Sequence, residues 1–310
     1  MKVFTQSTAG IREGGAGAKG NYMWLLLMVL LWGASWPVTK LALESVPPLW
    51  LAAIRFASAA LCLFGYLIIR GQLTVPVRAD VPILLSVAFL QMMAFTGLGM
   101  LAMVHIDTSR AVLLAYTTPL WCVLLSWLAF RQVPSRLQGV ALVVGMSGVA
   151  VVCSPAELNW ASSDTRLGAL FLVLAAVCWA VVILHVKRHQ WVSAPIALAP
   201  WQMLIAAVPL SAIAYASEGP PTSITLDTSL LQLLFFIGPV ATSACFVISS
   251  EYGRRVSTFS MSNFTLGVPL VGGGVSYAAF GNTVTPAFIL GLCLVVFGVV
   301  LSAIGARGTD

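Results

Sequence analysis

The chain has 310 residues, of which 59% are hydrophobic and 8% are charged, and its mean hydropathy is +0.97. These values exclude an ordinary water-soluble domain, because too few polar side chains are available to cover its surface. The net charge is +6, but the basic residues form no stripe with interleaved aromatic residues, so nucleic acid is not an expected partner.

Long uncharged runs recur along the chain, each with about the 20 residues that a helix needs to cross the hydrocarbon of a bilayer. Backbone groups in lipid must bond within their own structure, which leaves helices or a closed barrel. Barrel strands alternate apolar and polar residues over shorter segments, so the runs favour helices. The sequence therefore predicts an all-α, polytopic membrane protein in contact with the lipid bilayer.

Five helices are predicted in the first half of the chain. They cover Tyr22–Pro37, Pro48–Ile69, Val81–Met103, Ala111–Phe130 and Leu137–Cys153. The first of these also suits a cleaved signal peptide, because the basic residues Lys2, Arg12 and Lys19 precede it.

The same pattern begins again after a polar loop at 154–166. Three helices are predicted at Leu167–Val186, Ala194–Tyr215 and Leu230–Ser250. The uncharged stretch Val256–Ala306 is too long for one span, and Gly281, Asn282 and Pro286 divide it into two helices. The prediction is thus ten transmembrane helices.

The distribution of basic residues predicts the orientation. With a cytoplasmic N-terminus, external segments hold only Lys40, Arg110 and Arg166, and Arg55 lies within a helix, which leaves twelve of the 16 basic residues on the cytoplasmic side. Both termini are therefore expected in the cytoplasm, as an N-terminal tail at 1–21 and a C-terminal tail at 307–310. The loop at 154–166 is expected in the periplasm.

The two halves of the chain, 22–153 and 167–306, match each other at a nearly constant offset. The matched pairs include Trp32 with Trp179, Lys40 with Lys187, and Pro119 with Pro269. Five helices in a repeat is an odd number, so the second copy enters the membrane from the opposite side. Inverted repeats are typical of secondary transporters. The first hydrophobic run has a partner in mid-chain, which argues against a signal peptide.

Several motifs resemble a known family. Leu31–Pro37 reads LWGASWP and is similar to the helix-one signature of EamA-type members of the drug/metabolite transporter superfamily; further similarities lie at Ile54–Phe56, Ser109–Pro119 and Ser260–Pro269. The resemblance implies a multi-pass inner-membrane protein that exports small organic metabolites. Within the family, the chain resembles the YddG-like aromatic amino-acid exporters, and this resemblance implies amino acids, aromatic ones included, as substrates. The chain departs from the family at Arg131 and Gly281, where members commonly carry glutamate.

Central aromatic and polar residues are the candidates for contacts with a substrate. They are Trp32, Gln91, Tyr116, Trp179, Gln202, Ser243 and Asn263. Each also has a purely structural interpretation, as packing for the tryptophans and as interhelical hydrogen bonding for the polar residues. Pro119 and Pro269 are expected to kink their helices and to free backbone carbonyls that could add to the site.

Three basic residues at or within the helices are candidates for a structural or gating role. Arg55 lies seven residues into its helix, where a charge is costly and often functional. Lys40 and Lys187 end equivalent helices, as membrane-interface anchors commonly do.

Two alternative functions are compatible with single features of the sequence. Gly145–Gly148 matches the GxSG motif of rhomboid intramembrane proteases, but no histidine is predicted near Ser147 to act as its base. A passive channel is the other alternative, although no charged ring or carbonyl filter is evident. The six cysteines lack metal-site spacing, so neither a metal nor a cofactor is expected, and the protein is expected to function as a monomer.

Overall fold

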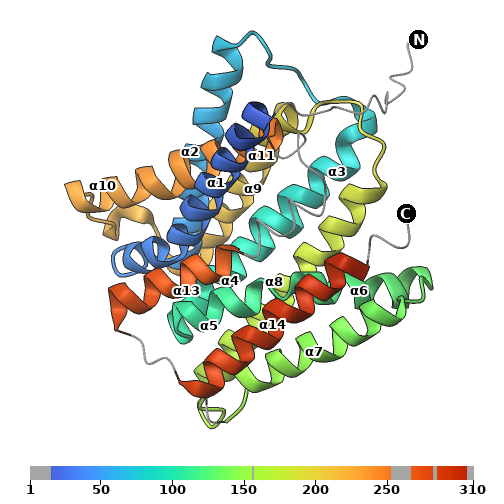
Figure 1. The fold of residues 1–310 in the computed structure, drawn as a ribbon. Helices are drawn as coiled ribbons and strands as arrows, with labels where there is room; N and C mark the ends of the chain where they lie inside the picture. The colour runs from blue at the N-terminus through green and yellow to red at the C-terminus, as the bar shows by residue number, and fades with distance from the viewer. Residues whose placement is uncertain (1–14, 156, 253–266, 282–284, 306–310) are drawn as a thin grey trace.

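A computed structural model describes residues 15–155, 157–252, 267–281 and 285–305, and Figure 1 shows them as a bundle of helices joined by loops. Within these ranges the chain contains no β-strand, which confirms the predicted all-α class.

The first half contains the helices α1 to α7. Their bounds are α1 Gly15–Ala42, α2 Pro48–Ile69, α3 Val81–Ser86, η2 Val87–Phe95, α4 Thr96–His105, α5 Thr108–Ala115, α6 Thr118–Phe130 and α7 Arg136–Val152, with a short 3₁₀ turn η1 at Arg78–Asp80. Helix α2 has the predicted bounds, because Pro48 occupies the first turn, where its missing N–H costs nothing, and Gly71 follows with a positive φ of 60°.

The second half begins with α8. Its elements are α8 Ser163–Arg188, α9 Pro195–Glu218, η3 Pro221–Ser223, α10 Thr228–Phe235, η4 Phe236–Ala244, α11 Cys245–Tyr252, α13 Gly267–Phe280 and α14 Pro286–Gly305. The predicted division of the last hydrophobic stretch agrees with α13 ending before Gly281 and α14 beginning at Pro286, whereas Asn282 lies outside the described residues.

Seven helical segments are long and apolar enough to cross a membrane. They are Asn21–Ala42, Pro48–Ile69, Arg78–His105, Thr108–Phe130, Ser163–Arg188, Pro195–Glu218 and Thr228–Tyr252. Shorter apolar helices, Arg136–Val152, Gly267–Phe280 and Pro286–Leu301, lie where the fifth, ninth and tenth spans are predicted. The described residues thus support seven spans by length and composition, and the count of ten stays a prediction.

Two segments of nine residues are π-helical, η2 in the third predicted span and η4 in the eighth. Phe236 opens η4, 149 residues after Val87 opens η2, so the segments occupy equivalent positions in the two halves. π-Helical segments are rare, and they are often found at functional sites. Their equivalent positions are further evidence for the internal repeat. They also suggest that a functional site lies between the two segments.

The fourth predicted span is not continuous, because α5 and α6 are separated at Tyr116 and Thr117. Pro119 has no N–H to donate to the carbonyl of Ala115, and the hydroxyl of Thr118 donates to that carbonyl instead, at 2.8 Å. The Thr117 hydroxyl donates in the same way to the carbonyl of Leu114, at 2.6 Å. The carbonyls near Pro119 are therefore bonded within the break, and the expected contribution of free carbonyls to a site is not seen there.

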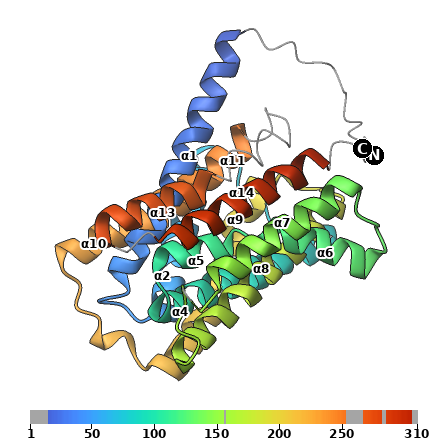
Figure 2. The same cartoon turned by 60° about the horizontal axis from the view of Figure 1, so that its bottom comes forward.

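Helices α7 and α14 lie side by side along their length, as Figures 1 and 2 both show. A side chain on Gly298 would lie 2.6 Å from the Cα of Gly145, and one on Gly148 would lie 2.8 Å from the carbonyl oxygen of Gly291. Backbone meets backbone at this contact, so glycine is needed at both positions.

A buried carboxylate joins the two halves at one end of the bundle. Asp80 is fully buried, and its oxygens accept hydrogen bonds from Nε2 of His189 at 2.9 Å and from the backbone N–H groups of Val192 and Ser193 at 3.2 and 2.8 Å. These donors belong to the loop between α8 and α9. The start of the third predicted span is thereby fastened to the second half of the chain.

Candidate functional site

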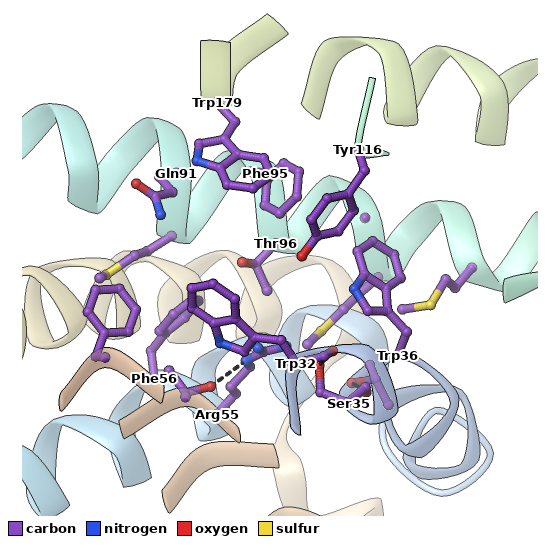
Figure 3. A pocket seen from close by; sticks show the side chains of 17 residues that line it. Trp32, Ser35, Trp36, Arg55, Phe56, Gln91, Phe95, Thr96, Tyr116 and Trp179 are labelled. Atoms are coloured by element: carbon purple, nitrogen blue, oxygen red, sulfur yellow. Dashed lines mark hydrogen bonds between the residues drawn. The ribbon is translucent and has the colours of Figure 1, made fainter. Parts of the chain in front are cut away.

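A cavity of about 110 Å³ lies in the middle of the bundle, and Figure 3 shows it from close by. Both halves of the chain contribute to its walls. The lining comes from α1 (Trp32, Ser35, Trp36, Thr39), α2 (Arg55, Phe56), η2 and α4 (Gln91, Met92, Phe95, Thr96, Gly99, Met100, Met103), the α5–α6 break (Tyr116), α8 (Trp179), η4 (Thr242) and α11 (Phe246). The two π-helical segments thus both reach the cavity.

Four of the predicted site residues meet at this cavity: Trp32, Gln91, Tyr116 and Trp179. The ring of Trp179 lies 5.6 Å from the ring of Tyr116 and 4.8 Å from that of Phe95, measured between centroids. These are normal separations for aromatic pairs, and in Figure 3 they form a wall opposite Arg55 and Trp32. Such a wall can contact a planar or apolar group of a ligand.

The other three predicted site residues are not among the lining residues. Gln202 is buried in α9. The hydroxyl of Ser243 donates to the backbone carbonyl of Ala59 at 3.0 Å and so joins η4 to α2. Asn263 lies outside the described residues.

Arg55 is the only formally charged side chain among the described residues that line the cavity. Its Nε donates a hydrogen bond to Oγ1 of Thr242 at 2.9 Å, from the first half of the chain to the second. Thr242 is not among the predicted site residues, because nothing distinguishes a single threonine in an apolar run. The nearby Pro239 is a sequence signal for irregular helix, and it could have pointed to this segment.

Neither of the two lysines is among the residues that line the cavity. Nζ of Lys40 donates to the backbone carbonyl of Met103 at 2.5 Å and joins the end of α1 to α4, while Lys187 is exposed at the end of α8. Pro269 lies in the first turn of α13, and residues 253–266, which precede this helix, lie outside the described ranges.

Among the described residues, the serine of the GxSG motif has a hydrogen-bond partner only in its own helix. Ser147 is exposed on α7, and its hydroxyl donates to the carbonyl of Val144 at 2.7 Å, within its own helix. Over the part of the chain that the structure describes, no three histidine, cysteine or acidic residues are grouped so as to hold a metal ion.

Comparison with known proteins agrees with this architecture. The sequence model of the EamA-like transporter family matches residues 20–154 and 166–304, one match in each half. A "probable amino-acid metabolite efflux pump" of Escherichia coli K12 is 26% identical over 291 residues, covering 91% of this chain and 94% of the relative. The "uncharacterized inner membrane transporter YedA" of the same strain is 25% identical over 289 residues, covering 91% and 90%. A solved crystal structure has a similar fold, with a TM-score of 0.63 and 19% sequence identity, covering 92% of this chain and 98% of the other.

Proposed function

The chain belongs to the EamA-like transporter family, and from this premise we propose that it exports small organic metabolites across the inner membrane, with amino acids, aromatic ones included, as substrates. The observation that carries the proposal is the central cavity, whose walls come from both halves of the chain. The name of the relative in Escherichia coli, an amino-acid metabolite efflux pump, supports the substrate class.

The size and lining of the cavity suit a small amphipathic molecule. Its volume of about 110 Å³ is below the roughly 300–1,000 Å³ of pockets for drug-sized ligands. Aromatic rings provide an apolar surface, and Ser35, Gln91 and Thr96 provide neutral hydrogen-bonding groups. A free amino acid has both an apolar side chain and polar groups that would match these walls.

We further propose that transport proceeds by alternating access. Ten helices form two inverted repeats, 22–153 and 167–306, which exchange conformations and expose the cavity to each side of the membrane in turn. The equivalent π-helical segments η2 and η4 support this arrangement, because each half contributes one of them to the cavity. Both repeats are in one chain, so a monomer is the functional unit.

Transport assays on purified protein in proteoliposomes test this function. We expect saturable flux of amino acids but not of sugar phosphates, nucleotides or cationic drugs. Replacing Trp179 or Trp32 by alanine removes part of the cavity wall and is expected to raise the KM on the order of tenfold, equivalent to about 1.4 kcal/mol of binding.

The matched control is Trp127→Ala, because Trp127 is 46% exposed on α6 and does not line the cavity. It should leave the KM unchanged. Non-saturating flux would indicate a channel, and an unchanged KM in both cavity variants would mean that substrates bind elsewhere.

The proposed orientation is tested by labelling single cysteines in a variant that lacks the six native ones. Ala161→Cys lies in the predicted periplasmic loop and Gln190→Cys in a predicted cytoplasmic loop, and both positions are exposed. A membrane-impermeant maleimide should label the first in intact cells and the second only after permeabilisation. The reverse pattern would invert the whole topology.

A further inference from the structure

The guanidinium of Arg55 uses only one of its three nitrogen atoms within the described part of the protein. Nε donates to Thr242, and neither Nη atom has a hydrogen-bond or ion-pair partner among the described residues. The side chain lines the cavity, as Figure 3 shows, and no acidic residue is among the described lining residues. Four N–H groups and a positive charge are thus available to a molecule in the cavity.

The hydroxyl of Thr242 is held in one orientation. It donates its single hydrogen to the carbonyl of Ile237, five residues earlier, at 2.8 Å. A hydroxyl has one donor and two acceptor sites, so the oxygen can only accept from Arg55. The spacing of five residues is that of the π-helix, and it ties the hydroxyl to the geometry of η4.

Close packing of η4 against α2 makes this contact reachable. Gly238 faces α2, where a Cβ would overlap the hydroxyl of Ser58 and would lie 3.1 Å from the backbone carbonyl of Arg55. Ser243, next to Thr242, bonds to the carbonyl of Ala59 on the same helix. Three contacts therefore fix the position of the Thr242 hydroxyl relative to Arg55.

We propose that Thr242 is a positioning residue that holds Arg55 by Nε, so that its two Nη atoms bind the carboxylate group of the transported molecule. This assignment rests on the proposed function and narrows its substrate class to small carboxylates with an apolar or aromatic body.

A guanidinium matches a carboxylate through two parallel hydrogen bonds, which adds both energy and geometric selectivity. A partly buried cation without a counter-ion inside the bundle is costly, and a bound carboxylate offsets part of that cost. The wall of Trp179, Phe95 and Tyr116 lies opposite and contacts the apolar body.

The experiment compares amino acids with their amides, which keep the amino group but lack the negative carboxylate, at two levels. Thermal unfolding of the full-length protein in detergent is followed with phenylalanine, tryptophan and leucine and with the amide of each. Counterflow of labelled phenylalanine in proteoliposomes gives KM and maximal rate. We expect the wild type to prefer each carboxylate over its amide by at least about tenfold, the effect of one charge-assisted hydrogen bond.

Substitutions at Thr242, with a control at Ser211, separate a positioning role from an effect on folding. Thr242→Val keeps the shape but removes the hydroxyl, and it should raise the KM about tenfold, change the maximal rate by less than about twofold and abolish the preference for carboxylates. Thr242→Ser restores the hydroxyl and should restore the preference. Ser211→Ala removes a hydroxyl that bonds only within α9 and should behave as wild type. If Thr242→Val does not fold, Arg55→Lys is tested instead. It keeps the charge but not the planar fork, and it should weaken the preference for carboxylates.

The outcomes distinguish this inference from the proposed function. Saturable flux with equal affinity for carboxylate and amide, or a Thr242→Val variant that keeps the preference, overturns the positioning role and leaves the exporter intact. Carboxylate-selective stabilisation that is lost in Thr242→Val, without flux in proteoliposomes, supports the site and overturns the export function. A wild type that none of the three carboxylates stabilises overturns the inference.

Discussion

Replacing Asp80 by alanine is expected to lower the free energy of unfolding by about 3 kcal/mol, because hydrogen bonds to a charged group contribute about 1.5–3 kcal/mol each and part of that is recovered from water. The carboxylate is fully buried and accepts from His189 and from two backbone N–H groups of the loop between α8 and α9. Without it, these donors lose their partner, and the first half of the chain is no longer fastened to that loop.

Thermal unfolding in detergent measures the effect, with Asp164→Ala as the matched control. Asp164 also lies near a histidine, His105, but at 3.8 Å and with 70% of its side chain exposed, so its removal should cost less than about 1 kcal/mol. Asp80→Asn keeps one acceptor oxygen and should fall between the two. Equal melting temperatures for the Asp80→Ala and Asp164→Ala variants would contradict the assigned role of the buried carboxylate.

Alanine at Gly298 is expected to lower the free energy of unfolding by about 1–3 kcal/mol, the usual cost of overpacking a well-packed contact. The added Cβ would lie 2.6 Å from the Cα and 2.7 Å from the backbone nitrogen of Gly145 on α7. Neither atom belongs to a flexible side chain that could move aside, so α7 and α14 would have to separate.

Gly139→Ala provides the control for this substitution within the same helix pair. Gly139 lies in α7 with nothing within 4 Å of its would-be Cβ, so alanine there should stabilise the helix by about 0.5–1 kcal/mol. Melting curves of the two variants should therefore shift in opposite directions. A Gly298→Ala variant as stable as the wild type would show that α7 and α14 are not in backbone contact.

Local features of the sequence predicted the class of protein and several helix bounds. Hydropathy alone indicates membrane helices, because the length of an apolar run is set by the thickness of the bilayer. The bounds of α2 follow from Pro48 and Gly71, whose backbone requirements act within one turn of the chain. Matching the two halves selected Trp32 and Trp179 as a pair, and both line the cavity.

Which polar side chains face the cavity depends on how the helices pack. Gln202 and Thr242 are both buried polar residues in apolar helices, yet only Thr242 lines the cavity. The direction of a side chain depends on the rotation of its helix, and the π-helical segment η4 changes that rotation in a way that hydropathy does not predict.

The contacts that position charged groups could not be predicted from the sequence either. Arg55 and Thr242 are 187 residues apart in the chain, and Asp80 and His189 are 109 apart. A motif depends on the spacing of residues within one segment, whereas these two pairs form only because segments far apart in the sequence pack together. Local sequence patterns are enough to indicate that the chain enters the membrane as helices in two related halves. The packing of those halves decided where the buried charges find their partners, because a hydrogen bond requires two groups within about 3 Å whatever their separation along the chain.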